Sequence, residues 1–263
     1  AESSVSAIDL TTGQTIKTVP VGAAPMALAV SPDGQRVYTA NSSGNSVSVV
    51  DLASGTTIAN IPAGGPYGLA LNPTGTRLYV SSTYFNNVSV IDTATGGTVA
   101  TIPVGVTPVG VTTNSTGTRL YVANRGFGTV STIDTATNQV IRTTAVGSLP
   151  QQVALTADGN RLYVTNTGSN SVSVIDANTG ANLATVPVGS AERLARTIAE
   201  LAPAGADAEL AWNPEFLREC LAVEDTLHPD RIVLGVRSEP DEQLMRTVYA
   251  PPGKEVPPFG IVG

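Results

Sequence analysis

The chain has 263 residues, and 14 Lys and Arg against 21 Asp and Glu give it a formal net charge of −7. This acidic balance, without any basic run, argues against nucleic-acid partners and against binding to anionic membranes. No stretch approaches the roughly 18 unbroken apolar residues of a membrane-spanning helix. No basic segment followed by an apolar core begins the chain, so no signal peptide is visible. The single cysteine allows no internal disulfide and leaves the compartment open.

A repeat of about 42 residues dominates the first 189 positions. One aspartate, one proline and one tyrosine recur in successive copies at intervals of 41 or 42 residues. The repeated positions are Asp9, Asp51, Asp92, Asp134 and Asp176, then Pro25, Pro66, Pro108 and Pro150, and Tyr38, Tyr79, Tyr121 and Tyr163. A period of this length, made of short strands and turns, is typical of a β-propeller blade.

In chain order, the first predicted elements are two strands over residues 4–9 and 15–21. Four units follow, and each has a Pro-led strand, a Tyr-containing strand, a strand that ends in Asp, and an outer strand. The clearest copy has these strands at 153–155, 161–166, 171–176 and 182–188, separated by Asp-, Asn- and Gly-rich turns. We therefore predict a mainly β chain, with a β-propeller of four full four-stranded blades plus an extra hairpin.

The extra hairpin has no inner strands of its own, which leaves two closures open. Either the ring closes as four blades plus the hairpin, or the blades form an open arc. The ends of such an arc would pair with the C-terminal segment or with another chain, since exposed sheet edges favour pairing. The second alternative predicts self-association through an unclosed propeller edge.

The repeats resemble the YVTN-type β-propeller family. The resemblance rests on Tyr163-Val164-Thr165-Asn166 and on its variants at 121–124 and 79–82, and it covers about 185 residues. It implies an extracytoplasmic or cell-surface protein, with either a binding-scaffold role or a lactonase activity.

Candidate site residues are those in which one repeat departs from its siblings. The recurring arginines and aspartates are interpreted as structural pairs or turn caps that every blade needs. The departures fall in the turn after the Tyr-containing strand, at Tyr84-Phe85 and at Arg125-Gly126-Phe127. Exposed aromatic rings and an arginine on neighbouring loops are typical of recognition surfaces. We expect Tyr84, Phe85, Arg125 and Phe127 to form interaction loops, and we expect no metal site.

Composition changes at residue 190, which predicts two modules, 1–189 and 190–263. The second holds seven Lys and Arg against thirteen Asp and Glu, and contains the only Trp, Cys and His. Helices are predicted over 191–201 and from Ser238 to Tyr249, and strands over 209–212 and 231–236. This is the order of a small α/β, partly Rossmann-like segment. The Pro- and Gly-rich end, 250–263, is expected to be a frayed terminus.

This second module resembles the UDP-glucose/GDP-mannose dehydrogenase family. The resemblance rests on residues 213–219 (Asn-Pro-Glu-Phe-Leu-Arg-Glu), 222–225 (Ala-Val-Glu-Asp) and 228–235, which begin His-Pro-Asp-Arg. It extends backwards into 185–189 (Thr-Val-Pro-Val-Gly), which also fit the propeller repeat. A recombination or a gene fusion within these shared residues would explain the double match.

The dehydrogenase resemblance implies roles for a few residues. Thr185 and Glu215 would position the hydrolytic water, and Phe216, Leu217, Arg218 and Glu219 would contact the substrate. Other parts that the family needs are missing: the glycine-rich turn that holds NAD, the nucleophilic cysteine and a lysine from a following helix. Cys220 stands where the family usually has glycine. The sequence therefore predicts no active catalytic residue and no cofactor, with NAD only under the enzymatic alternative.

The prediction for the whole chain is a non-catalytic β-propeller binding or scaffold protein with a vestigial dehydrogenase segment. One alternative is an NAD-dependent nucleotide-sugar oxidoreductase, and a second is a propeller lactonase. The ligand and the protein partner are not identified by the sequence. The propeller resemblance suggests an extracytoplasmic location, whereas the dehydrogenase resemblance suggests a cytoplasmic one.

Overall fold

The computed structural model describes residues 3–189, 232–234 and 259–261. Every regular element in these ranges is a β-strand, so none of them contains a helix that could span a membrane. Contacts divide the chain into two compact units, Ala1–Pro187 and Val188–Gly263. The prediction of a mainly β propeller region is confirmed.

The strands of the first unit come in one pair and four sets of four. In chain order they are β1 (Ser4–Ile8), β2 (Thr15–Pro20); β3 (Pro25–Val30), β4 (Arg36–Asn41), β5 (Ser46–Asp51), β6 (Thr56–Pro62); β7 (Pro66–Leu71), β8 (Arg77–Ser82), β9 (Asn87–Asp92), β10 (Thr98–Pro103); β11 (Pro108–Thr113), β12 (Arg119–Asn124), β13 (Thr129–Asp134), β14 (Gln139–Ala145); β15 (Pro150–Leu155), β16 (Arg161–Asn166), β17 (Ser171–Asp176), β18 (Asn182–Pro187).

Each set of four forms one antiparallel sheet whose strands lie in sequence order, and β1 and β2 form a separate hairpin. The register repeats from sheet to sheet. Tyr38 faces Val49 across β4 and β5, and Tyr79 faces Val90 across β8 and β9. Tyr163 in β16 faces the matching residue of β17. The predicted equivalence of the repeated tyrosines is therefore confirmed.

Consecutive residues of the middle strands are buried because both faces of each inner sheet are covered. Tyr38 from the first sheet packs with Leu78 and Ile91 from the second sheet. Tyr79 on the opposite face of the second sheet packs with Leu120 of the third sheet in the next cluster. Successive side chains of a strand point to opposite faces, so neighbouring apolar residues such as these fill two cores only if a sheet lies on each side. The sheets therefore stack face to face in series.

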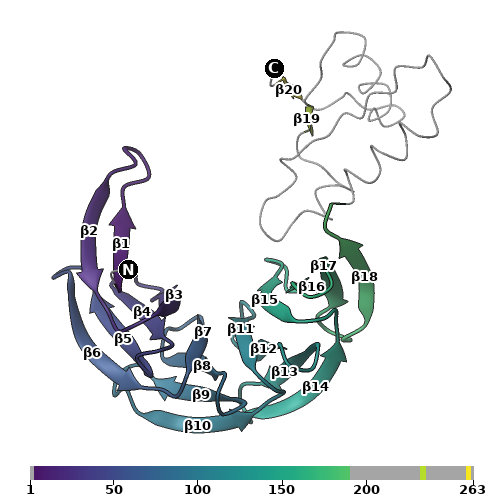
Figure 1. Cartoon of the computed structure of the whole chain (residues 1–263), viewed down its shortest axis with the longest axis horizontal. Helices are drawn as coiled ribbons and strands as arrows, with labels where there is room; N and C mark the ends of the chain where they lie inside the picture. Colours follow the sequence, from purple (N-terminus) through teal and green to yellow (C-terminus); the bar gives the residue numbers. More distant parts are fainter. Residues whose placement is uncertain (1–2, 190–231, 235–258, 262–263) are drawn as a thin grey trace. The chain divides into compact units, whose positions relative to one another are not determined.

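Glycine on an inner strand permits the close approach of the next sheet. A Cβ atom placed on Gly68 of β7 would lie 2.2 Å from the carbonyl oxygen of Val109 in β11. At Gly110 of β11 the nearest atom would be the carbonyl oxygen of Gln151 in β15, at 2.7 Å. The Pro-led strands consequently follow one another along the inner side of the unit, as Figure 1 shows for β3, β7, β11 and β15.

The first sheet is only partly covered on its outward face. The β1–β2 hairpin contributes Val19, which packs with Val37 and Val50 of that sheet. On the inner strand β3, Leu28 remains 54% exposed, whereas its counterpart in the second sheet, Leu69, is 8% exposed. Among the described strands, the β1–β2 hairpin is not accompanied by two inner strands, as it would be in a full blade, and so no inner strand covers Leu28. Self-association through this edge stays a prediction, which the mass in solution tests.

In the second unit the structure describes a parallel pair of short strands, β19 (Ile232–Leu234) and β20 (Phe259–Ile261). β19 lies within the strand predicted over 231–236. The prediction of a frayed terminus is wrong at 259–261, because these three residues pair with β19. The predicted helices and the strand at 209–212 lie outside the described residues.

The shared sequence at the junction adopts the hairpin. β18 pairs antiparallel with β17, with Val172 opposite Val186 and Val174 opposite Ala184. Five residues, 177–181, connect the two strands, whereas a parallel partner would need a long crossover, which costs more loop entropy. The predicted antiparallel pairing is confirmed.

Deleting residues 191–263 should leave the amide protection of Leu183 to Val186 in place, because the hydrogen bonds of β18 come from β17. Hydrogen exchange measured by mass spectrometry on the full and shortened chains tests this, with β14 as the internal control. Loss of protection confined to β18 would mean that the strand depends on the C-terminal segment.

Candidate functional site

The two ends of each sheet differ in chemistry. Because the strands are antiparallel, Arg36 at the start of β4 lies beside Asp51 at the end of β5, and Asn41 lies beside Ser46. The same pairing recurs in the other sheets. We call the first end, where the strands end in Asp, the aspartate end. The other end, which follows residues such as Asn41 and Asn124, is the asparagine end.

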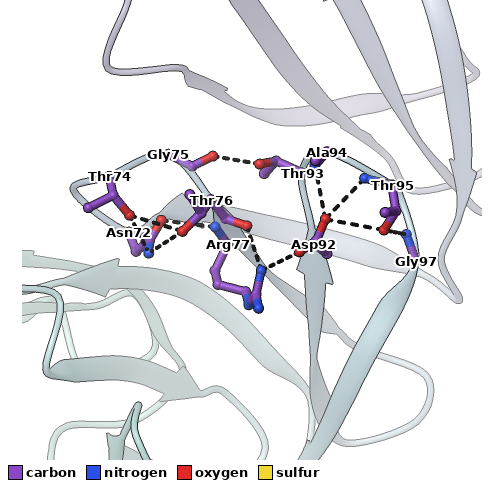
Figure 2. A network of polar contacts seen from close by, with 10 residues as sticks. All are labelled: Asn72, Thr74, Gly75, Thr76, Arg77, Asp92, Thr93, Ala94, Thr95 and Gly97. Atoms are coloured by element: carbon purple, nitrogen blue, oxygen red, sulfur yellow. Dashed lines mark hydrogen bonds and ion pairs between the residues drawn. The ribbon is translucent and has the colours of Figure 1, made fainter.

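Repeated charges at the aspartate end hold turns together. Oδ1 of Asp92 accepts hydrogen bonds from the backbone amides of Ala94, at 3.1 Å, and Thr95, at 3.0 Å. Its other carboxylate oxygen pairs with the guanidinium of Arg77, as Figure 2 shows. An equivalent pair in the next sheet, Arg119 and Asp134, is 2.5 Å apart. These contacts support the interpretation of the recurring charges as turn caps and structural pairs.

The same hydrogen bonds lower the pKa values of the aspartates. For Asp92 and Asp134 the main cause is the backbone amide of the residue three positions later, Thr95 or Thr137. The amide of Thr12 acts in the same way on the pKa of Asp9. Donation to an ionised carboxylate favours the charged form. The aspartates therefore serve as fixed negative caps and are poor acids or bases at neutral pH.

A buried amide organises the asparagine end. Nδ2 of Asn124 donates to the hydroxyl oxygens of Ser131, at 2.9 Å, and Thr129, at 3.1 Å. The second sheet has Ser82 in this position. There the ring of Phe85 packs over Gly64, so that an added Cβ would lie 2.0 Å from Cε2. Phe85 therefore has a local packing role beside the smaller Ser82, which its deviation from the repeat did not reveal.

Two of the predicted loop residues meet in one pocket at the asparagine end. Tyr84 and Arg125 both line a cavity of about 520 Å³, together with side chains from the neighbouring sheets. We call it the Arg125 pocket. Phe85 and Phe127 are exposed by 65% and 69% but are not among its lining residues. The complete lining is Ser42, Tyr67, Thr83, Tyr84, Thr107, Val109, Arg125 and Gln151.

Tyr67 and Gln151 were missed by the sequence reasoning. Both follow the Pro that starts an inner strand, and Met26 and Val109 occupy the same place in the other sheets. The signal was available, since this position differs in every repeat. The side-chain amide of Gln151 donates to the hydroxyl oxygen of Tyr67, which joins β15 to β7 across the intervening β11. Because that oxygen accepts, the hydroxyl proton of Tyr67 is free to donate into the pocket.

The pocket walls are fixed by backbone contacts. The Thr83 hydroxyl donates to the carbonyl oxygen of Gly65 at 2.9 Å. Oδ1 of Asn86 accepts from the amide of Thr107 at 2.9 Å, and both residues have positive φ. The lining contains hydroxyls, an amide and a guanidinium, but no carboxylate, thiol or imidazole. Such a pocket can bind and orient a ligand, and its lining contains none of the carboxylate or imidazole groups that usually act as general bases.

The residues that carry the dehydrogenase resemblance are mostly outside the described part. Glu215 and residues Phe216 to Glu219 lie outside the described residues. Thr185 is described, and it is an exposed residue of β18 opposite Ser173. Gly126 and Gly128 lie within the turn between two strands, β12 and β13. A pyrophosphate cradle needs a glycine turn that opens a helix. The described residues therefore do not fit NAD, and no group of three metal-ligating side chains occurs among them.

Comparison with known families gives matches of two kinds. The family model for a YNCE-like beta-propeller matches residues 2–119, and the one for the seven-bladed lactonase beta-propeller matches residues 62–186. The NAD-binding domain model of the UDP-glucose/GDP-mannose dehydrogenase family matches residues 159–252. Both resemblances are confirmed. The dehydrogenase match overlaps the lactonase propeller match over residues 159–186, and the structure places residues 161–186 of this overlap in a propeller blade.

Curated relatives match a short part of the chain. The UDP-glucose 6-dehydrogenase of Rickettsia typhi is 57% identical over 54 residues, which are 20% of this chain and 12% of that protein. The Rhizobium meliloti enzyme of the same name is 47% identical over 62 residues, 23% of this chain and 14% of that protein. The chain thus spans a small fraction of these enzymes.

Solved structures match about two thirds of the chain. Hydrazine synthase of Kuenenia stuttgartiensis aligns with a TM-score of 0.60 and 28% identity, over 66% of this chain and 51% of that one. A functionally unknown protein of Desulfotomaculum acetoxidans aligns with the same TM-score at 18% identity, over 65% of this chain and 59% of the other. The second likeness concerns the fold alone.

Acid should destabilise the propeller. The pKa values of the capped aspartates in the folded state lie below the unfolded value of about 3.9. Their contribution to the stability of the fold is therefore complete above the unfolded pKa value and is lost as the pH falls through the folded pKa values. The melting temperature, followed by circular dichroism, should therefore fall below about pH 4. Asp92→Asn with Asp134→Asn should lower it at neutral pH and flatten the acid decline. An unchanged acid profile in this variant would contradict the capping role.

Proposed function

We propose that the propeller region is a non-catalytic binding scaffold and that the Arg125 pocket is its ligand site. The observation that carries this proposal is the lining, which is rich in hydrogen-bond donors but has no acid, thiol or imidazole. Its size falls in the range of about 300–1,000 Å³ that is usual for small-molecule sites. Binding needs oriented donors, and hydrolysis needs in addition a base or an activated water.

The repeats supply a rigid support for this site. Tyr67 and Gln151 project from inner strands of two sheets that flank a third, and their hydrogen bond fixes both side chains. Thr83 is tied to Gly65 by its hydroxyl group. Side chains held in this way lose little entropy when a ligand binds, because their positions are already restricted. A small polar molecule is the kind of ligand that such a pocket suits.

The scaffold proposal extends to the dehydrogenase segment, which we regard as inactive. An NAD-binding segment is present in the sequence match but is partial. Hydride transfer needs a bound cofactor, and the glycine turn that would hold its pyrophosphate is absent from the sequence. We therefore expect the purified chain to contain no bound NAD.

A lactonase activity is the second candidate function, because the lactonase family model matches residues 62–186. This range includes most of the Arg125 pocket. The chemistry of the pocket opposes this activity. Tyr67, Gln151 and Arg125 can donate hydrogen bonds to a carbonyl oxygen, but none of them can activate water.

A pocket-filling variant tests the binding proposal. Small polar molecules should be screened by ligand-observed NMR, and those that bind should lose binding to Ser42→Trp, since the indole ring would occupy the cavity. Ser54→Trp, in an exposed turn at the aspartate end, is the matched control and should bind as the wild type does. Ligands that bind equally to both variants would show that the pocket is not the site, and the absence of any ligand would overturn the proposal.

Enzyme assays test the non-catalytic part. Purified protein should reduce no NAD with UDP-glucose or GDP-mannose and should hydrolyse no lactone. Turnover of NAD that disappears in Glu215→Ala would establish the dehydrogenase alternative. Lactone hydrolysis that disappears in Tyr67→Phe would establish the lactonase alternative, because the hydroxyl group is then needed for the reaction.

A further inference from the structure

The charges of the first unit are divided unequally between its ends. Five of its aspartates close strands at the aspartate end, and the turns at this end hold two more. The strand-starting arginines lie there too, and Lys17 bonds to the carbonyl oxygens of Leu52 and Ala53 at the same end. Arg142 lies against Gly180, also in an aspartate-end turn. Within residues 3–187, Arg125 is therefore the only charged side chain at the asparagine end.

The distance between the ends makes this charge effective. The strands that separate them have six residues, which span about 17 Å at a rise of about 3.4 Å per residue. The Debye length at physiological ionic strength is about 8 Å. The aspartates are too distant to neutralise Arg125, whereas Arg77 and Arg119 each have a carboxylate partner.

We propose that the Arg125 pocket binds a small organic molecule through a single carboxylate group. This inference rests on the proposed binding function and names its ligand class. A guanidinium holds a carboxylate with two parallel hydrogen bonds. The free proton of the Tyr67 hydroxyl, fixed in direction by Gln151, supplies a further donor. No carboxylate in the pocket lining competes for these donors.

The pocket suits an organic monocarboxylate better than an inorganic anion. One guanidinium balances one negative charge, whereas a phosphate dianion is usually bound by several cationic groups or amide donors. The cavity of about 520 Å³ is also much larger than a bare anion. The rings of Tyr67 and Tyr84 and the side chain of Val109 form walls that contact the carbon body of a ligand.

An NMR titration tests the ligand class. The side-chain Nε–H signal of Arg125 is assigned by its loss in Arg125→Gln and is followed with acetate, benzoate and galacturonate. Acetamide, benzamide and galactose are their neutral counterparts, and phosphate and sulfate form a separate arm, all at millimolar concentration. At least one carboxylate should shift the signal, and its neutral counterpart should bind about tenfold more weakly or less, since charge-assisted hydrogen bonds are lost.

Variants identify the groups responsible. Arg125→Gln should weaken binding of the active carboxylate by about tenfold or more, and Tyr67→Phe by a smaller factor. Arg36→Gln removes the same charge at the aspartate end and should leave binding unchanged, which separates a local contact from net charge.

Four results would overturn the inference. They are no shift with any of the three carboxylates, equal binding of a carboxylate and its neutral counterpart, equal loss of binding in Arg36→Gln and Arg125→Gln, and stronger binding of phosphate or sulfate than of every carboxylate. Neutral ligands that bind the wild type but not Ser42→Trp would leave the proposed binding function intact while the carboxylate inference fails. If no ligand of any charge responds to Ser42→Trp, the binding function itself fails.

Discussion

The first unit depends on the burial of both faces of each inner sheet. Leu120 and Ile133 of the third sheet face the second sheet, whereas Tyr121 of the third sheet faces the fourth sheet, and all three are nearly inaccessible to solvent. Burying one such side chain stabilises a fold by about 1.5–3 kcal/mol. Because the apolar faces of each sheet pack mainly against the neighbouring sheets, stability grows with each added sheet and is lowest at the two ends.

The strand ends and the turns that follow them can vary in sequence because they contribute little to these cores. At the asparagine end the second sheet has Ser82 where its siblings have Asn41 and Asn124, and the ring of Phe85 lies over the adjoining glycine. Beside this substitution, Tyr84 lines a pocket with an arginine from the next sheet. The aspartate end is more uniform, because its charges cap turns in every sheet. The candidate binding residues thus lie at the asparagine end, where fewer charged side chains have a structural role.

The junction shows how local pairing competes with a distant one. Residues 185–189 fit both the propeller repeat and the dehydrogenase family, and their composition suits either strand. In the structure β17 lies one short turn away and provides a complete row of backbone partners. A parallel partner requires the chain to cross over first, so the cost of closing the loop precedes any gain from pairing.

The repeat and the order of the strands follow from the sequence alone, because a period of 42 residues and the pattern within each strand are local features. The sequence also indicated Tyr84 and Arg125 as departures from that repeat. The tertiary structure was needed to show that these two share a pocket, that Phe127 does not line it, and that Tyr67 and Gln151 do. Neighbouring sheets bring together residues as much as 84 positions apart, as in the hydrogen bond between those last two side chains. The strand at 259–261 was likewise hidden, since its partner at 232–234 is distant in sequence and three residues carry no periodicity.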